Sequence, residues 1–207
     1  MRALSLLRLV LCLGICFVGL AARADEPHPG PYLEIGAGAL LLEDQSIRLG
    51  GEEVARFDYE PTYQLGGAIG YRFGQTVRFA VDFQYADVRP DRVRFLGTRA
   101  GFRGGIDAFT VTLNGFYDFV NRSRITPYVG AGMGVAIVEP RNLRLEGMRL
   151  RGGDEHFTIV SEGGFAVSVT PFLQLVPAYR FQWIDDGDRA IENSIAHILR
   201  LALRASF

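Results

Sequence analysis

Cysteine and histidine are scarce in this chain. Its 207 residues include two cysteines and three histidines. Cys12 and Cys16 both lie in an apolar stretch near the N-terminus, and the histidines are scattered without the spacing of metal ligands. Structural metal sites are built from closely spaced cysteines and histidines. We therefore predict no metal site, no cofactor, and no disulfide or thiol chemistry in the mature chain.

Lysine is absent, so all 22 basic residues are arginines, and they stand against 23 acidic residues. Loss of Arg2, Arg8 and Arg23 with an N-terminal signal segment would reduce the basic residues from 22 to 19, which gives a net charge of −4. Proteins that bind nucleic acids carry clustered positive charge in excess. This balance argues against a nucleic acid as the partner.

Long apolar runs are also absent beyond the N-terminus. The run 9–20 is too short for a transmembrane helix, which needs about 18 apolar residues or more. Basic residues precede the run, and Ala22 and Ala24 place small residues on either side of Arg23, just before Asp25. This pattern is typical of a signal peptide. The sequence predicts a cleaved signal peptide at 1–24, a periplasmic lead-in at 25–31 and one domain at 32–207.

Apolar and polar residues alternate through the rest of the chain. In the clearest segment, Val77, Phe79 and Val81 alternate with Arg78 and Asp82. A period of two residues is typical of a β-strand with two different faces. Eight segments have this pattern, and we predict strands at 32–42, 62–73, 77–88, 107–119, 128–138, 156–169, 172–183 and 196–207.

The connections between these segments alternate between long and short. Short ones follow the second, fourth and sixth segments, and long ones follow the others. This order predicts an all-β fold, an antiparallel up-and-down eight-stranded transmembrane β-barrel with short turns in the periplasm and long loops outside. Pro177 lies in the seventh segment and cannot donate a ladder hydrogen bond, so it predicts a bulge or a locally broken pairing.

Charged residues in the segments share the parity that faces the barrel interior. An eight-stranded barrel is just wide enough for side chains to fill it, so we predict a packed ionic plug. Its predicted members are Glu34, Arg72, Arg78, Asp82, Asp118, Glu162, Arg180, Arg200 and Arg204. Aromatic residues are assigned to the two membrane interfaces. These are Tyr32, Tyr71, Phe73, Phe119, Tyr128, Phe172 and Phe207 on the turn side, and Tyr85, Phe109 and Trp183 on the loop side.

The signal segment, the eight alternating strands, the connection lengths and the terminal Phe207 together resemble a superfamily of small outer-membrane barrels. That superfamily comprises the OmpA transmembrane domain, OmpX-like proteins and opacity-type proteins of Gram-negative bacteria. The resemblance implies a location in the outer membrane, in contact with membrane lipid. It also implies that the barrel-assembly machinery recognises the last strand, through Leu203, Ala205 and Phe207.

Three of the long loops have the pattern of hairpins that continue the strands, each with glycine at its tip. Guanidinium groups bind phosphate in bidentate fashion, so we predict that loop arginines contact lipopolysaccharide phosphates or an anionic partner. These arginines are Arg92, Arg94, Arg99, Arg103, Arg141, Arg144, Arg149 and Arg151. The alternative is that they are solvated residues on strand extensions. An exposed strand edge is a second way to bind an unknown extracellular partner.

Two further functions are weighed against this structural and surface-interaction role. A lipid-modifying enzyme would need a nucleophile, a base and a carboxylate in contact. The candidates are His156, Ser161 and Glu162, or Ser194 and His197 with Glu192. Parity separates Ser161 from the first set, so we predict no catalysis. A small pore is the other alternative, but the charged interior is expected to occlude it.

Overall fold

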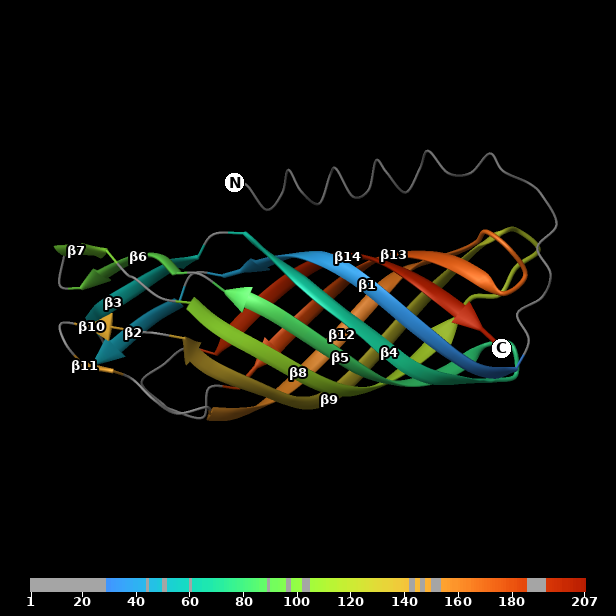
Figure 1. Cartoon of the computed structure of the whole chain (residues 1–207), viewed down its shortest axis with the longest axis horizontal. Coiled ribbons are helices and arrows are strands. Elements are labelled where there is room, and N and C mark those ends of the chain that lie inside the picture. The colour runs from blue at the N-terminus through green and yellow to red at the C-terminus, as the bar shows by residue number, and fades with distance from the viewer. Residues whose placement is uncertain are drawn as a thin grey trace.

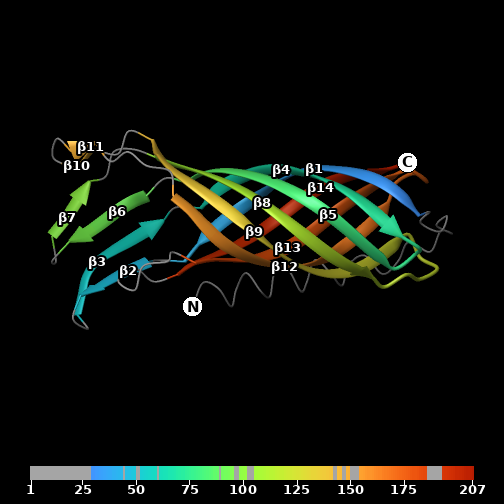
Figure 2. The same cartoon turned by 90° about the horizontal axis from the view of Figure 1, so that it is seen from below.

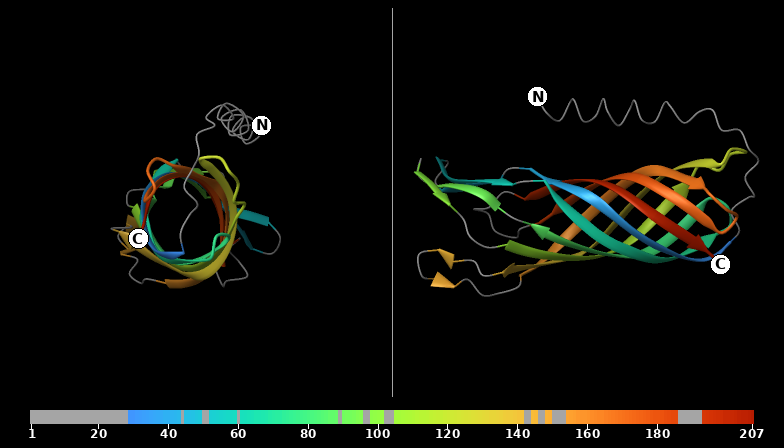
Figure 3. Two further views of the ribbon diagram at one scale, coloured as in Figure 1. Left: turned by 90° about the vertical axis from the view of Figure 1, so that its right-hand side faces the viewer. Right: turned by 45° about the horizontal axis from the view of Figure 1, so that its top comes forward.

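The computed structural model describes residues 29–43, 45–49, 52–59, 61–88, 90–95, 98–101, 105–141, 144–145, 148–149, 154–185 and 193–207. Eight strands form a closed barrel in the order β1-β14-β13-β12-β9-β8-β5-β4. Seen along its axis, the barrel is a closed ring (Figure 3). The barrel strands are β1 (Gly30–Leu42), β4 (Thr62–Phe73), β5 (Val77–Val88), β8 (Gly105–Asp118), β9 (Ile125–Arg141), β12 (Asp154–Ser168), β13 (Leu173–Ile184) and β14 (Ser194–Ser206).

All eight pairings in the barrel are antiparallel, and the first and last strands close it through β1 and β14. The prediction of an eight-stranded antiparallel barrel is therefore confirmed. The predicted segment 1–24 lies outside the described residues. Among the described residues, no helix has the length and apolarity needed to cross a membrane.

Some strands are longer than the alternation of their side chains suggests. β9 was predicted at 128–138 but runs from Ile125 to Arg141, and its ladder to β8 continues through the pairs Ile106↔Pro140 and Gly105↔Arg141. Backbone hydrogen bonds between the strands continue beyond the outward-facing apolar residues. The alternation of apolar and polar residues, in contrast, stops where those apolar residues stop. The hydrophobic pattern therefore marks the lipid-embedded part of a strand better than its ends.

The three short turns and Phe207 lie at one end of the barrel, opposite the loop strands (Figure 1). Between β4 and β5, Gly74 has a φ of 64°, which glycine adopts without steric cost. Between β8 and β9, the amide of Asn121 donates to the carbonyl oxygen of Ile125 at 2.9 Å. These tight turns agree with the predicted periplasmic side of an outer-membrane barrel.

Side chains of the barrel strands alternate between the outer surface and the lumen. On the outer surface, Ile35 is 70% exposed and Leu113 is 60% exposed, whereas Arg78 and Ile198 in the lumen are 0% exposed. Large apolar side chains on a water-exposed surface would be unfavourable in such number. The exterior is therefore a lipid-facing surface, and the lumen contains the charges.

Two aromatic residues, Tyr32 and Tyr128, lie in the lumen and not at a membrane interface. Tyr32 and Tyr128 were expected at the turn-side interface, but each is 2% exposed and lies in the lumen. Both have even numbers in strands whose even positions face inward. The prediction was wrong because it relied on the aromatic residue type. The odd or even position of a residue in its strand decides which face its side chain lies on.

Pro177 breaks the pairing on one side of its strand only. β13 pairs with β14 without interruption, including Pro177↔Leu201. Toward β12, the pairs Gly164↔Ala178 and Val167↔Leu175 are present, but the two pairs between them are missing. The register is the same on both sides of the gap, so the predicted local break is confirmed and there is no bulge.

Six shorter strands continue the barrel at the loop end (Figures 1 and 2). They are β2 (Gln45–Leu49), β3 (Glu52–Tyr59), β6 (Pro90–Phe95), β7 (Thr98–Gly101), β10 (Arg144–Leu145) and β11 (Met148–Arg149). They form the three predicted hairpins, whose glycine tips lie outside the described residues. β3 also pairs with β6, so the first two hairpins form one sheet in the order β2-β3-β6-β7. This pairing was not predicted.

Candidate functional site

The structure places all nine residues of the predicted ionic plug in the barrel lumen. None of them is more than 8% exposed. They comprise five arginines and four carboxylates, which leaves one positive charge in excess. Buried charges at this density need close partners, because leaving a buried charge unpaired costs several kcal/mol. Their contacts divide into a central chain of ion pairs and a cluster at the turn side.

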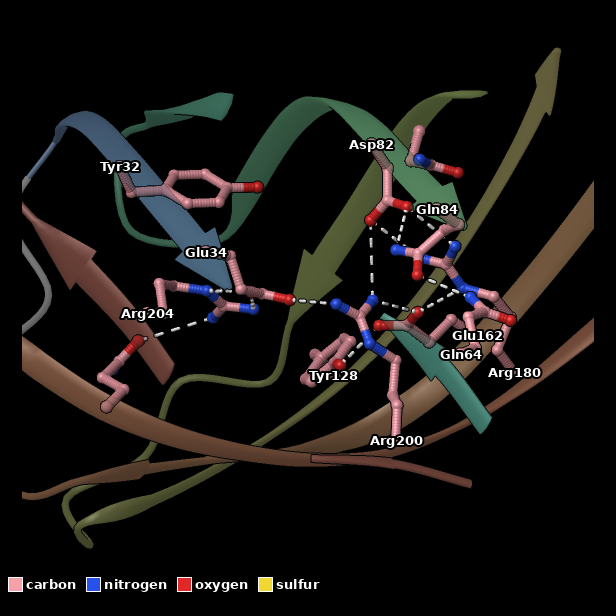
Figure 4. Close-up of polar contacts among 12 residues, drawn as sticks. Tyr32, Glu34, Gln64, Asp82, Gln84, Tyr128, Glu162, Arg180, Arg200 and Arg204 are labelled. Atoms are coloured by element: carbon pink, nitrogen blue, oxygen red, sulfur yellow. Dashed lines mark hydrogen bonds and ion pairs between the residues drawn. The ribbon is translucent and has the colours of Figure 1, made fainter. Parts of the chain in front are cut away.

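The central chain begins on the two strands that close the barrel. Arg204 of β14 donates from Nε to Glu34 Oε2 of β1 at 2.8 Å. Arg200, four residues earlier in β14, donates from Nη2 to Glu34 Oε1 at 2.7 Å. Glu34 therefore bridges two arginines of the neighbouring strand, as Figure 4 shows. This contact links the N-terminal and C-terminal strands of the barrel.

The chain then crosses the lumen. Arg200 Nη1 donates to Glu162 Oε2 at 2.9 Å, and Arg180 Nε donates to the same oxygen at 2.7 Å. Arg180 also donates from Nη1 and Nη2 to the two carboxylate oxygens of Asp82, at 3.0 and 3.1 Å. Tyr128 completes the shell of Glu162 by donating its hydroxyl proton at 2.6 Å.

The pair of Asp82 and Arg180 joins opposite walls of the barrel. Asp82 belongs to β5 and Arg180 to β13, and three strands separate these two in either direction around the ring. Direct hydrogen bonds between opposite walls narrow the lumen at that cross-section. The geometry therefore favours a closed lumen over the alternative of a small pore.

The turn-side cluster is centred on Arg78. Its Nε and Nη2 donate to Asp118 at 2.8 Å each, and Nη1 donates to the hydroxyl oxygen of Tyr32 at 3.2 Å. Arg72 reaches the same carboxylate at 3.2 Å. The guanidinium carbon of Arg78 lies 4.6 Å from the ring centroid of Phe116, a distance typical of a cation–π contact. Aromatic rings thus surround the cation where water would otherwise be.

Uncharged polar side chains fill the lumen on the loop side of the ion pairs. Gln64 donates to Gln84 at 2.5 Å, and Gln84 in turn donates to Asp82. Gln182 donates to Thr158 at 3.3 Å. Within the described residues, every buried side-chain nitrogen or oxygen has a hydrogen-bond partner. Such a fully satisfied network rigidifies the interior.

Small residues make the room that this network occupies. A Cβ atom at Gly132 of β9 would contact the amide of Asn114 and lie 2.5 Å from the carbonyl oxygen of Leu113. At Gly70, a Cβ atom would contact the ring of Tyr32. Neighbouring side-chain and backbone atoms therefore occupy the space beside these glycines.

The first candidate catalytic set, His156, Ser161 and Glu162, does not come together in the structure. Ser161 lies on the outer surface, whereas Glu162 lies in the lumen, and His156 Nδ1 is 3.1 Å from the carbonyl oxygen of Asp185. His197 engages Tyr179 through Nδ1 at 2.6 Å and Glu43 through Nε2 at 3.0 Å. Both nitrogens of His197 thus contact residues other than Ser194, and Glu192 lies outside the described residues.

The loop arginines lie on several separate strands. Arg92 and Arg94 are in β6, Arg99 is in β7, Arg141 ends β9, and Arg144 and Arg149 are in β10 and β11. Arg103 and Arg151 lie outside the described residues. At the other end, Leu203 is 46% exposed and Phe207 is 73% exposed, and Ala205 pairs with Leu33. The described residues contain no group of three or more His, Cys, Asp or Glu that could hold a metal ion.

A closed antiparallel barrel with an apolar exterior and an ionic interior is a transmembrane barrel of the bacterial outer membrane. A family model described as Opacity family porin protein matches residues 69–182, which is more than half of the chain. The protein belongs to this Opacity family of porin proteins. No curated protein sequence matches the chain.

Solved structures of outer-membrane barrels share the fold. Neisserial surface protein A (NspA) aligns with a TM-score of 0.62 at 20% identity, over 86% of this chain and 97% of that chain. The outer membrane protein OprG from Pseudomonas aeruginosa aligns with a TM-score of 0.62 at 15% identity, over 89% and 97%. The outer membrane protein AlkL in DMPC lipid bilayers aligns with a TM-score of 0.51 at 17% identity, over 91% and 95%. At these identities the likeness concerns the fold alone.

Proposed function

We propose that this protein is a non-catalytic outer-membrane barrel with a structural and surface-interaction role, exercised by its extracellular loops. The observation that carries the proposal is the contrast between the two parts of the molecule. The ion pairs of the lumen satisfy one another and bridge opposite walls, as between Asp82 and Arg180. The arginines of the loop strands β6, β7, β10 and β11, in contrast, belong to segments beyond the barrel strands, which supports a contact with anions outside.

The anions nearest to such loops are the phosphates of lipopolysaccharide in the outer leaflet. Guanidinium groups bind phosphate with two parallel hydrogen bonds, which makes arginine well suited to this contact. The proposed contact residues are Arg92, Arg94, Arg99, Arg103, Arg141, Arg144, Arg149 and Arg151. The segment 1–24 is proposed to direct export, and Leu203, Ala205 and Phe207 are proposed to present the last strand to the barrel-assembly machinery.

Simultaneous replacement of Arg92, Arg94, Arg99 and Arg103 by glutamine is expected to reduce the lipopolysaccharide that copurifies with the barrel. Four charge-assisted contacts are removed, each worth about 1.5–3 kcal/mol when fully formed. The measurement is the ratio of lipopolysaccharide to protein after extraction in mild detergent.

The matched control replaces Arg122 and Arg124, which are exposed in the turn between β8 and β9, by glutamine. These arginines lie at the periplasmic end, so their loss should leave lipopolysaccharide retention unchanged. Equal retention by the loop variant and the wild type would contradict the proposed function.

A further inference from the structure

The outer wall of the barrel has a groove over β1, β4, β5 and β8, which are neighbours in the ring (Figure 1). The groove has a volume of about 420 Å³, and its lining is almost entirely apolar. Its sides are formed by the outward-facing side chains of Ile35, Leu65, Phe83, Tyr85 and Phe109. Sites for small organic molecules typically have volumes of about 300–1,000 Å³. The groove therefore has the size and the apolar character of a site for a hydrocarbon group.

A glycine on the outer face creates the groove. Gly67 of β4 is directly opposite Ile35 of β1 on one side and Phe83 of β5 on the other. Residues directly opposite on adjacent strands share one face of the sheet. A Cβ atom at Gly67 would lie 2.7 Å from the carbonyl oxygen of Glu34, so the approach of β1 leaves no room for a side chain. The outer face thus has a gap between two large apolar side chains.

A second outward-facing glycine shows that such a position can also be covered. Gly115 of β8 is opposite Phe79, and a Cβ atom at Gly115 would lie 3.3 Å from the ring of Phe79. At Gly67, in contrast, the three atoms nearest to such a Cβ are backbone atoms of Glu34 and Ile35. An aromatic ring therefore covers Gly115, whereas the gap at Gly67 stays open.

The groove lies in the half of the barrel wall that is nearer to the loops. Tyr85 and Phe109 are a cross-strand pair near the loop ends of β5 and β8, and the hydroxyl of Tyr85 donates to Asp107 at 2.9 Å. Such a tyrosine is typical of the membrane–water interface. Ile35, at the other end of the groove, lies near the middle of β1. Because the long loops are outside, the groove runs from the outer interface toward the bilayer centre, within the outer leaflet.

We propose that this groove binds one acyl chain of a lipid of the outer leaflet. The groove is continuous with the lipid-facing exterior of the barrel, so hydrocarbon chains surround it. A polar ligand would lose its hydrogen bonds to water against this apolar lining, whereas an acyl chain has none to lose. The site lies on the barrel wall. The inference therefore goes beyond the proposed function and does not depend on the loop arginines.

Packing holds the chain in the groove. The chain lies in hydrocarbon whether it is bound or free, so the hydrophobic effect does not favour binding. On the convex wall elsewhere, a chain contacts protein on one side. In the groove it also contacts the side chains that rise on both sides of Gly67. Dispersion contacts are weak individually and large in sum. An acyl chain is therefore expected to occupy the groove more than other parts of the wall.

The test uses the protein folded into nanodiscs of phosphatidylcholine, in which a small fraction of the lipid carries a photoreactive diazirine on one acyl chain. One probe has the diazirine near the ester group, and a second has it near the end of the chain. After illumination, mass spectrometry of peptides measures the label on each outward-facing residue. The reference residues are Met133 of β9 and Ile159 of β12, which are 60% and 45% exposed.

The reference residues lie opposite the groove. Three strands separate β9 from β1, and β12 from β4, in either direction around the ring. The summed label of both probes on the groove residues is expected to exceed that on Met133 and Ile159 about fivefold, because many weak contacts add up there. The probe near the ester group should label Tyr85 and Phe109, and the probe at the chain end should label Ile35.

A filling variant tests whether the shape of the groove causes this preference. Ile35→Phe/Leu65→Phe places two rings beside Gly67, and its labelling is expected to fall to the level of the reference residues. The matched control is Met133→Phe/Ile159→Phe, which adds two rings to the opposite wall and should leave the labelling of Phe83, Tyr85 and Phe109 unchanged. Retained heat-modifiable mobility on SDS gels shows that each variant is folded.

Three results would overturn the inference. One is label on the groove residues of the wild type within about twofold of that on Met133 and Ile159, which decides the matter even if a variant fails to fold. Another is equal labelling of Phe83 in the filling variant and the wild type. The third is cross-linking of the groove to a second barrel in place of lipid, which would make the groove a contact between two copies of the chain.

Discussion

Replacement of Glu162 by glutamine is expected to lower the free energy of unfolding by about 3–5 kcal/mol, the cost of removing one partner from a buried ion pair. Glu162 accepts hydrogen bonds from Arg180 at 2.7 Å, from Arg200 at 2.9 Å and from Tyr128 at 2.6 Å. Glutamine keeps the size of the side chain but removes its charge. Two buried guanidinium groups then share the remaining carboxylates, in a lumen that already has one positive charge in excess.

The measurement is equilibrium unfolding in urea, with the protein folded into lipid vesicles. The matched control is Glu43→Gln. Glu43 also has a polar partner, His197 Nε2 at 3.0 Å from its Oε1, but its side chain is 56% exposed. Exposed pairs contribute about 1 kcal/mol or less, so the control should be nearly as stable as the wild type. Equal stability of the two variants would show that the interior network does not stabilise the barrel.

Replacement of Leu113 by arginine is expected to destabilise the folded barrel in vesicles by about 2–4 kcal/mol, the cost of a cation on the lipid face at the bilayer midplane. Leu113 lies within β8, on the outer surface, and is 60% exposed. On a water-facing surface, the same change would have little effect, because surface substitutions rarely exceed about 0.5 kcal/mol.

Val169→Arg is the matched control for depth. Val169 is 57% exposed, nearly the same as Leu113, but it follows the end of β12 at the turn side. Near an interface the cost of an arginine falls to about 0–1 kcal/mol. The two positions have nearly equal exposed fractions, so exposure alone predicts equal losses of stability. We expect the free energy of unfolding in vesicles to be lower for Leu113→Arg than for Val169→Arg. If both variants lose the same stability, the exterior does not face a bilayer at the depth described.

Strand parity alone predicted which charged residues lie inside the barrel. Glu34, Asp82 and Glu162 are far apart in the sequence, and each is buried because its position in its strand has the inward parity. Lipid excludes charge from one face of every strand, so this signal is strong and local. The same rule would have placed Tyr32 and Tyr128 in the lumen, had it been applied to aromatic residues.

No local sequence pattern of this kind predicts contacts between different loops. The pairing of β3 with β6 joins residues of two loops, and nothing local in either loop indicates that Arg56 lies opposite Arg94. The partners of His197 were missed for a similar reason. Glu43 follows β1 and Tyr179 belongs to β13, so the contact requires the order of strands around the barrel.

The central claim is that one face of each strand meets hydrocarbon, and Trp183 allows a direct measurement of it. Trp183 is the only tryptophan of the chain and lies near the loop end of β13, where it pairs with Ile159 and Ile195. The native protein and the variant Trp183→Phe/Leu113→Trp are folded into vesicles whose lipids carry bromine either near the ester group or near the end of the acyl chain. Bromine quenches only the tryptophan that it touches, so the two proteins report on two depths of the same surface.

Shallow bromine should quench Trp183 more strongly than deep bromine, and the order should reverse for tryptophan at position 113. Acrylamide in the water should quench the tryptophan at position 113 weakly. A failure of both brominated lipids to quench either protein, with strong quenching by acrylamide, would contradict the lipid-facing exterior.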